Sequence, residues 1–405
     1  MTDLDPRWYD YARRDQPHFD ATVYLEQVVR DPEHLSGLVD DAIRTAVGHA
    51  PGSLRIRAFR DRAFDYQATA ALVTSTVGQG ERSHEWLSRV VGDTESCIAV
   101  NGVSAWSLPL SRWAREAVNS LLGGGAYTLP SGADVYTFVA GSGWTPFGVH
   151  RDSEPSLLFH LGPGKKETWV WPVDTLQPDE GFWRNPSFGS PLSFDFDRHL
   201  DAAYHVTLEP GDFISIPKHA FHVFRNVGLS AFVGIALYPA KTEALLRAAI
   251  GSAVLERADL GEDLGAGRLE LDHALGRFSA IDDLRRAVRD QLDRAELLKR
   301  TAGYLDEINP VVTRRTVLDT GATLRWEFPG IVGVRRCGSS TELVTRGRPV
   351  RYAADLDFTA LTRMTAERPC FSYDELSDAL PRELSTRDRE RTIQHMHLSG
   401  AFSPS

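Results

Sequence analysis

The sequence predicts an α+β protein in which a β-sandwich or β-barrel lies between helical segments. Residues 126–240 hold short runs rich in β-branched and aromatic residues, such as ADVYTFVAG (133–141) and SAFVGIALYP (230–239). Gly and Pro separate these runs, and many short strands joined by turns are typical of a sandwich or barrel. On both sides of this region, apolar residues recur at helical spacing instead.

The N-terminal segment, residues 1–125, is predicted to mix helices with short strands and to flank the barrel. SLRIRAF (53–59) alternates between apolar and polar residues, as a half-buried strand does. LSRWAREAVNSLL (110–122) repeats its apolar residues at helical spacing, and the GGG run at 123–125 ends that helix. The barrel itself is predicted to occupy residues 126–240.

A polar, aromatic insertion interrupts the barrel region between Pro172 and Ala203. A segment of this length is too long for a passive connection between strands. We therefore expect it to form a lid or a loop that faces the substrate. Trp183 and Arg184 within it are candidates for substrate contact.

After the barrel, the chain is predicted to form helices first and then a unit that contains both strands and helices. Residues 241–310 contain KTEALLRAAIGSAVL and a longer charged, amphipathic run at 281–305. Helices of the second kind form helical hairpins and dimer contacts, so a homodimer is one expected arrangement. Asn309-Pro310 marks a boundary. Residues 311–405 then read as strands followed by three helices, which predicts a winged-helix-like domain.

The composition argues against several classes of protein. A formal net charge of −10 opposes nucleic acid, because binding DNA or RNA depends on cations that neutralise phosphates. No stretch reaches the roughly 18 apolar residues of a membrane span, and the N-terminus lacks the apolar core of a secretory signal. Cys97, Cys337 and Cys370 stand apart, so they build neither a disulfide framework nor a C-x-x-C site. We expect a cytoplasmic protein without membrane partners, in which His and carboxylate side chains bind any metal.

The segment GWTPFGVHRD (143–152) provides the first candidate metal ligands. His150 and Asp152 are two residues apart, so both would point to the same face of a strand. Together with a distant His they form the two-His-one-carboxylate set that holds Fe(II) on one face. The alternative is a surface turn without a metal. A second His-x-Asp, His199 and Asp201, lies inside the insertion and is interpreted as accidental.

The segment EPGDFISIPKHAFHVFRN (209–226) provides the distant His. Gly211 would make a tight turn before a buried strand, His222 begins the next strand, and Asn226 follows on the same face. The pattern Gly-x₅-Pro-x₄-His-x₃-Asn resembles the second motif of the cupin superfamily, whose His is a metal ligand. His219 is a departure, because the family often has Gly at that place.

With both segments in hand, the chain resembles the JmjC-type members of the cupin superfamily. Those proteins are iron- and 2-oxoglutarate-dependent dioxygenases built on a double-stranded β-helix, also called a jelly roll. The order of barrel, helical segment and winged-helix-like unit is similar to that of the ribosomal oxygenases, a JmjC branch that hydroxylates ribosomal proteins. The barrel resemblance covers residues 126–240, and the resemblance of the later units rests on their order. The resemblance to the JmjC-type proteins implies that His150, Asp152 and His222 bind Fe(II), and that 2-oxoglutarate and O₂ are cosubstrates.

The resemblance also implies a basic residue that pairs with the far carboxylate of 2-oxoglutarate. Lys165 and Lys166 both lie on the strand that follows His-x-Asp, and the spacing favours Lys166. The alternative is that both lysines are exposed. In the family a Tyr or Thr hydroxyl often supplements the lysine, which makes Tyr136 a candidate and Thr145 a weaker one.

The implied activity is that of an oxidoreductase, a hydroxylase of a protein or peptide side chain or of an amino-acid-like small molecule. Attack on an N-methyl group would give a demethylated amine instead. One alternative is a metal cupin that works without 2-oxoglutarate, such as a dioxygenase or isomerase. Another is a non-catalytic binding protein with a vestigial barrel, which predicts that no metal binds.

Overall fold

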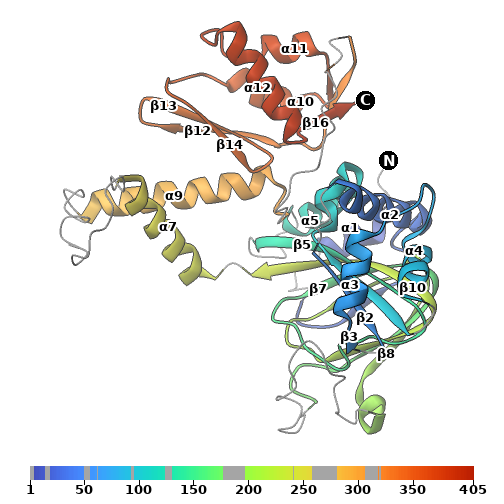
Figure 1. Cartoon of the computed structure of the whole chain (residues 1–405). Coiled ribbons are helices and arrows are strands. Elements are labelled where there is room, and N and C mark those ends of the chain that lie inside the picture. The colour runs from blue at the N-terminus through green and yellow to red at the C-terminus, as the bar shows by residue number, and fades with distance from the viewer. Residues whose placement is uncertain are drawn as a thin grey trace, which may run out of the picture. The chain divides into compact units, whose positions relative to one another are not determined.

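A computed structural model provides the structure of the chain (Figure 1). It describes residues 4–13, 19–49, 55–61, 63–92, 95–123, 130–176, 197–239, 241–257, 281–305, 318 and 321–405. Two compact units are present, and each is described by itself. The first comprises Met1–Pro239 with Tyr304–Arg315, and the second comprises Ala240–Gly303 with Thr316–Ser405.

The first unit combines helices with a large antiparallel sheet. Its helices are α1 (Pro6–Ala12), α2 (Pro32–His49), α3 (Tyr66–Thr74), α4 (Ser83–Val91) and α5 (Leu108–Gly123), with 3-10 turns η2 (Val103–Trp106) and η3 (Asp197–Ala202). Its strands are β1 (Val23–Leu25), β2 (Arg55–Arg60), β3 (Ala63–Phe64), β4 (Ser96–Asn101), β5 (Pro130–Ala140), β6 (Gly143–Trp144), β7 (Ser156–Val170), β8 (Tyr204–Leu208), β9 (Phe213–Ile216) and β10 (His222–Pro239). The prediction of a mixed fold with a β-rich centre is confirmed.

Two long strands organise this sheet. The main path runs β1-β9-β7-β10-β5-β4-β2-β3, with β8 added beside β7 and β6 beside β10. The first part of β7 pairs with β9, and its last part pairs with β8. Likewise, β10 pairs first with β6 and later with β5. The register of β7 and β10 shifts between Val227 and Ser230, so the strand pair bends there and serves both parts of the sheet.

The two faces of the sheet pack against different partners. Because side chains alternate along a strand, Leu157 and Phe159 of β7 join the core that contains the helices, whereas Leu158 faces the other way. Helix α5 contacts both α1 and α2, and α2 also contacts β7 and β10 (Figure 1). The opposite face holds Leu158, Ile214, Phe224 and Phe232 in a separate apolar cluster. This second face also bears the candidate lysine.

Local sequence explains where the helices begin. Asp5 caps α1 by accepting a hydrogen bond from the backbone N–H of Arg7, and Pro6 occupies the first helical turn. Asp65 accepts from the N–H of Ala68 in the same way and starts α3. The predicted strand at 53–59 corresponds to β2, and the predicted helix at 110–122 corresponds to α5.

The second unit contains helices α7 (Thr242–Arg257), α9 (Ile281–Thr301), α10 (Thr359–Glu367), α11 (Tyr373–Asp378) and α12 (Thr386–Leu398). Its strands are β11 (Leu324–Trp326), β12 (Val332–Cys337), β13 (Ser340–Thr345), β14 (Arg348–Tyr352), β15 (Cys370–Phe371) and β16 (Phe402–Pro404). They form two three-stranded antiparallel sheets, β12-β13-β14 and β15-β11-β16. A winged-helix classification for this unit stays a prediction.

The central part of the predicted insertion lies outside the described residues. Trp183 and Arg184, the candidates for substrate contact, belong to it, so their placement is left open. In the described part of the chain, no helix is both long and apolar enough to cross a membrane.

Candidate metal centre

The main chain brings the two metal-binding segments together. His150 and His222 form an isolated antiparallel bridge, in which the N–H of His150 donates to the carbonyl of His222 at 3.1 Å. The N–H of His222 donates to the carbonyl of His150 at 2.8 Å in return. His219, whose φ is +65°, donates its N–H to the carbonyl of Asp152 at 2.8 Å. These three bonds hold residues that are about seventy positions apart in the sequence at one place.

In each imidazole ring, Nδ1 donates a hydrogen bond to a nearby backbone carbonyl. Nδ1 of His150 lies 3.0 Å from the oxygen of Gly148, and Nδ1 of His222 lies 3.1 Å from the oxygen of Ala220. A carbonyl oxygen only accepts, so Nδ1 carries a proton in both rings, and Nε2 is the nitrogen that is left to bind a metal. Metal-binding histidines are oriented by such a bond to their second nitrogen.

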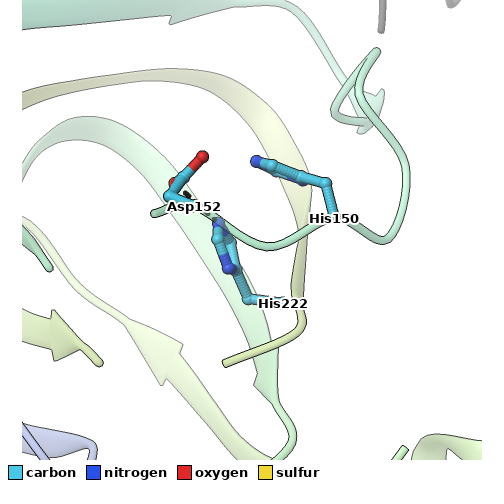
Figure 2. Close-up of side chains that lie close together, drawn as sticks. All are labelled: His150, Asp152 and His222. Carbon is cyan, nitrogen blue, oxygen red and sulfur yellow. Dashed lines mark ion pairs between the residues drawn. The ribbon is translucent and has the colours of Figure 1, made fainter. Parts of the chain in front are cut away.

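The three predicted ligands converge. Figure 2 shows the side chains of His150, Asp152 and His222 pointing toward one another, with one ligand atom from each within 4.8 Å of the others. Nε2 of His222 lies 3.7 Å from Oδ2 of Asp152. In the described part of the chain, this is the one group of three such side chains close enough to share a metal ion.

Burial adjusts the protonation of this cluster. Burial, and secondarily the neighbouring His150, lowers the pKa of His222 from 6.5 to about 4. The ring is therefore neutral near pH 7, which is the state that binds a metal. Two neutral imidazole nitrogens and one carboxylate oxygen fit Fe(II), and a set of three protein ligands leaves positions open for other ligands.

The second His-x-Asp does not take part in this cluster. His199 and Asp201 lie in η3, and the backbone carbonyl of His199 accepts a hydrogen bond from Nε1 of Trp171 at 2.9 Å. Neither residue joins the metal-binding group of the described residues.

The two candidate lysines have opposite environments, because neighbours on a strand point to opposite faces. Lys165 is half-exposed and forms an ion pair with Glu209. Lys166 is 1% exposed and points into the apolar cluster on the inner face of the sheet. Lys166 is therefore the lysine whose charge is removed from water.

Lys166 is surrounded by neutral groups. Its Nζ donates to Oδ1 of Asn226 and lies 5.1 Å from the ring centroid of Phe232 and 5.6 Å from that of Phe224. Burial lowers its pKa from 10.5 to about 8, and Cys97 opposes this effect. A buried ammonium group is costly without an anion, and among the described residues no carboxylate contacts Nζ. The sequence placed Asn226 on the same strand face as His222 through their period-two spacing. It did not predict that Asn226 accepts a hydrogen bond from Lys166.

The other two candidates use their hydroxyl groups within the protein. The hydroxyl of Thr145 donates to the carbonyl of Phe224 at 3.2 Å. Burial raises the pKa of Tyr136, while a hydrogen bond to Ser156 acts in the opposite direction. The ring of Tyr136 covers Gly234, where an added Cβ would lie only 2.4 Å from the ring carbon Cζ.

Comparison with known proteins adds information on the fold. Neither a protein-family model nor a curated protein matches the sequence. Among solved structures, YcfD, a ribosomal oxygenase from Escherichia coli, matches over the whole of both chains with a TM-score of 0.52 and 15% identity. The chain shares the fold of this ribosomal oxygenase. The predicted resemblance to that branch is thereby confirmed at the level of fold.

Two further structures of the same enzyme contain ligands. YcfD in complex with cobalt and 2-oxoglutarate matches with a TM-score of 0.50 and 15% identity, over 100% of this chain and 99% of that one. The complex of YcfD with cobalt and succinic acid matches equally well. At this level of identity, the likeness concerns the fold.

Proposed function

We propose that the chain is an Fe(II)- and 2-oxoglutarate-dependent oxygenase that hydroxylates a protein or peptide side chain or an amino-acid-like molecule. The main observation behind this proposal is that the side chains of His150, Asp152 and His222 converge. The Nδ1 atoms of both rings already form hydrogen bonds to backbone carbonyls. The fold supports the proposal, because YcfD shares it and has been solved with cobalt and 2-oxoglutarate.

In this proposal the three side chains of the triad would hold the metal ion. His150 and His222 would bind through Nε2, and Asp152 would bind through a carboxylate oxygen. When bound, the ferrous ion supplies the redox chemistry in which O₂ and 2-oxoglutarate are consumed and succinate and CO₂ are formed. The chain would orient these ligands through the bonds that its backbone makes to both imidazole rings.

Lys166 would bind the far carboxylate of 2-oxoglutarate. Its ammonium group is buried among Asn226 and two phenyl rings, so an anionic ligand would offset the cost of its burial. This feature favours a 2-oxoglutarate-dependent enzyme over a metal cupin that works without this cosubstrate. Lys165, which is paired with Glu209 at the surface, is not assigned a role.

The test is succinate formation by the purified protein with Fe(II), O₂ and 2-oxoglutarate, together with its iron content. His150→Ala should abolish the turnover and lower the iron content, because it removes one of three ligands. His199→Ala is the matched control, since it alters the other His-x-Asp and should leave both quantities unchanged. Unchanged turnover in His150→Ala would remove the triad from the reaction. Turnover absent from the iron-loaded wild type would overturn the proposal.

A further inference from the structure

Arg55 and Arg57 of β2 share a face of the strand but form different bonds. They are two residues apart, so their side chains leave the strand on the same side. Nη2 of Arg55 donates to Oδ1 of the buried Asp134 at 2.9 Å. Nη2 of Arg57 donates instead to Oδ1 of Asn101, a neutral amide, at 3.0 Å. Because Nδ2 of Asn101 donates to Asp134 at 2.7 Å, the orientation of this amide is fixed from behind.

Strand register places Arg57 on the inner face of the sheet. Arg57 lies opposite Ala99, which lies opposite Phe138 on the next strand. Phe138 in turn lies opposite Phe232. Directly opposed residues of antiparallel strands have neighbouring side chains on one face. Since the ring centroid of Phe232 lies 5.1 Å from Nζ of Lys166, Arg57 belongs to the face that bears this lysine.

Phe147 connects Arg57 to the candidate metal centre. Cζ of Arg57 lies 5.8 Å from the ring centroid of Phe147. That centroid lies 5.5 Å from the ring centroid of His150. The same aromatic ring therefore adjoins both the guanidinium group and a proposed metal ligand, which places Arg57 within reach of a substrate that is positioned at the triad.

The aromatic rings beside Arg57 continue to the protein surface. The ring centroid of Phe147 lies 5.1 Å from that of Phe59, and the centroid of Phe59 lies 5.6 Å from that of Phe64. Phe64 packs against Tyr66 with a centroid distance of 4.4 Å, and Tyr66 is 79% exposed. These rings form a continuous apolar strip from the triad to the surface, with the guanidinium group at its side.

The guanidinium group of Arg57 has lost part of its hydration. The side chain is half-buried. Burial lowers its pKa, and the opposite effects of Cys97 and Asp134 are smaller. A guanidinium group has five N–H donors in a planar fork that matches a carboxylate, and the bond to Asn101 uses one of them. A carboxylate brought by a ligand would offset the cost of this burial.

We propose that Arg57 binds a carboxylate group of the substrate beside Phe147, and that this contact makes the enzyme select acidic substrates. Two parallel hydrogen bonds to a carboxylate fix its orientation as well as its charge, so Arg57 would orient the substrate relative to His150. The carboxylate belongs either to an acidic side chain of a peptide or to the α-carboxylate of an amino-acid-like molecule. This inference rests on the proposed function and names the substrate class.

The experiment follows the binding of benzoate to the full-length protein, loaded with Mn(II) and saturated with 2-oxoglutarate. Mn(II) broadens the nuclear magnetic resonance signals of nearby protons, so broadening of the benzoate signals reports binding close to the triad. Benzamide has the same ring without the charge and should bind about tenfold more weakly, since a hydrogen bond to a charged group is lost. Arg57→Gln should weaken benzoate binding about tenfold and leave benzamide binding unchanged.

Two further variants control for charge and for position. Arg57→Lys keeps the charge without the planar fork, so it should retain part of the preference for benzoate. Arg60→Gln is the matched control, because Arg60 leaves the same strand on the opposite face, and it should bind benzoate like the wild type. Mn(II) affinity by electron paramagnetic resonance and 2-oxoglutarate affinity by calorimetry should stay at the wild-type values in all three variants and so report an intact fold.

Two pairs of larger probes identify the source of the carboxylate. Phenylalanine and phenylalaninamide test the α-carboxylate of a free amino acid, and the capped tripeptides Phe-Glu-Phe and Phe-Gln-Phe test an acidic side chain. A preference for the acid in either pair supports the inference, and equal binding within both pairs contradicts it.

The inference and the proposed function can fail separately. If the Mn(II)-loaded wild type binds 2-oxoglutarate but broadens benzoate and benzamide equally, or if Arg57→Gln binds benzoate like the wild type, the inference fails alone. If the Mn(II)-loaded wild type does not bind 2-oxoglutarate, the proposed function fails with it.

Discussion

In His150 and His222, a single hydrogen bond at Nδ1 determines which ring nitrogen is available to bind a metal. In each residue the carbonyl two positions earlier in the chain occupies Nδ1. The remaining nitrogen, Nε2, is the one that can bind a metal. Because this bond is local, the orientation of each ring does not depend on a distant side chain, and the site is prepared before an ion arrives.

At the same scale, the ionisation of Lys166 gives a prediction about pH. Burial lowers its pKa to about 8, so the ammonium form prevails below that pH and the neutral amine above it. The amine binds a carboxylate poorly. The KM for 2-oxoglutarate should therefore be constant below pH 8 and rise above it, approaching roughly tenfold per pH unit.

Steady-state succinate formation between pH 6.5 and 9.5 checks this expectation. Lys165→Gln should behave like the wild type, because Lys165 lies at the surface. Lys166→Arg should retain its charge throughout the range and show a flatter profile. A KM that does not change between pH 7 and 9.5 in the wild type would contradict the assignment of Lys166.

At the scale of single elements, β10 depends on a glycine beneath an aromatic ring. Gly234 pairs with Tyr136, and a Cβ there would meet the ring at 2.4 Å. Gly234→Ala should therefore lower the free energy of unfolding by about 1–3 kcal/mol, because the inner face has no room for it. Gly37→Ala in α2 is the control, since a Cβ there meets nothing within 4 Å.

Urea unfolding followed by Trp fluorescence measures both changes. Gly37→Ala should leave the free energy of unfolding at the wild-type value or raise it by up to about 1 kcal/mol, since Ala suits a helix interior better than Gly. Equal destabilisation by the two substitutions would show that the ring of Tyr136 is not packed as described.

The bend in β7 and β10 marks the limit of what sequence patterns predict. The His-x-Asp pair and the later motif predicted the triad, and the alternation of a strand separated Lys166 from Lys165. The register shift after Val227 has no comparable signature in the sequence, yet it decides which residues of the later parts of β7 and β10 pair with each other. The contact of Lys166 with Asn226 and that of Thr145 with Phe224 lie before this shift, and they were not predictable because strand alternation gives the face of a residue but not its partner across the sheet.

At the scale of the whole chain, the second unit offers a stability test away from the proposed site. Glu342 is buried, and its carboxylate binds Arg294 at 2.8 Å and Arg335 at 3.3 Å. Glu342→Gln removes the buried carboxylate that these two arginines share, although Arg335 keeps an ion pair with Asp290 at 3.2 Å, and it should lower the free energy of unfolding by about 3 kcal/mol. Glu243→Gln, which alters the exposed pair with Arg247 on α7, is the control and should have no measurable effect.

Thermal unfolding and succinate formation should be measured on both variants. We expect Glu342→Gln to lower the melting temperature while leaving the KM for 2-oxoglutarate at the wild-type value at 20 °C. A variant as stable as the wild type would show that the buried ion pairs contribute little. The overall division into two units could be expected from the change in sequence pattern near residue 240, whereas the two three-stranded sheets of the second unit could not.

The main-chain bonds between His150, His222, His219 and Asp152 have an evolutionary consequence. Every residue except proline carries both a backbone N–H and a carbonyl, so these bonds would persist if any one of the ligand side chains were replaced. A descendant of this protein could exchange a ligand side chain, and with it the metal or the reaction, while inheriting the geometry unchanged.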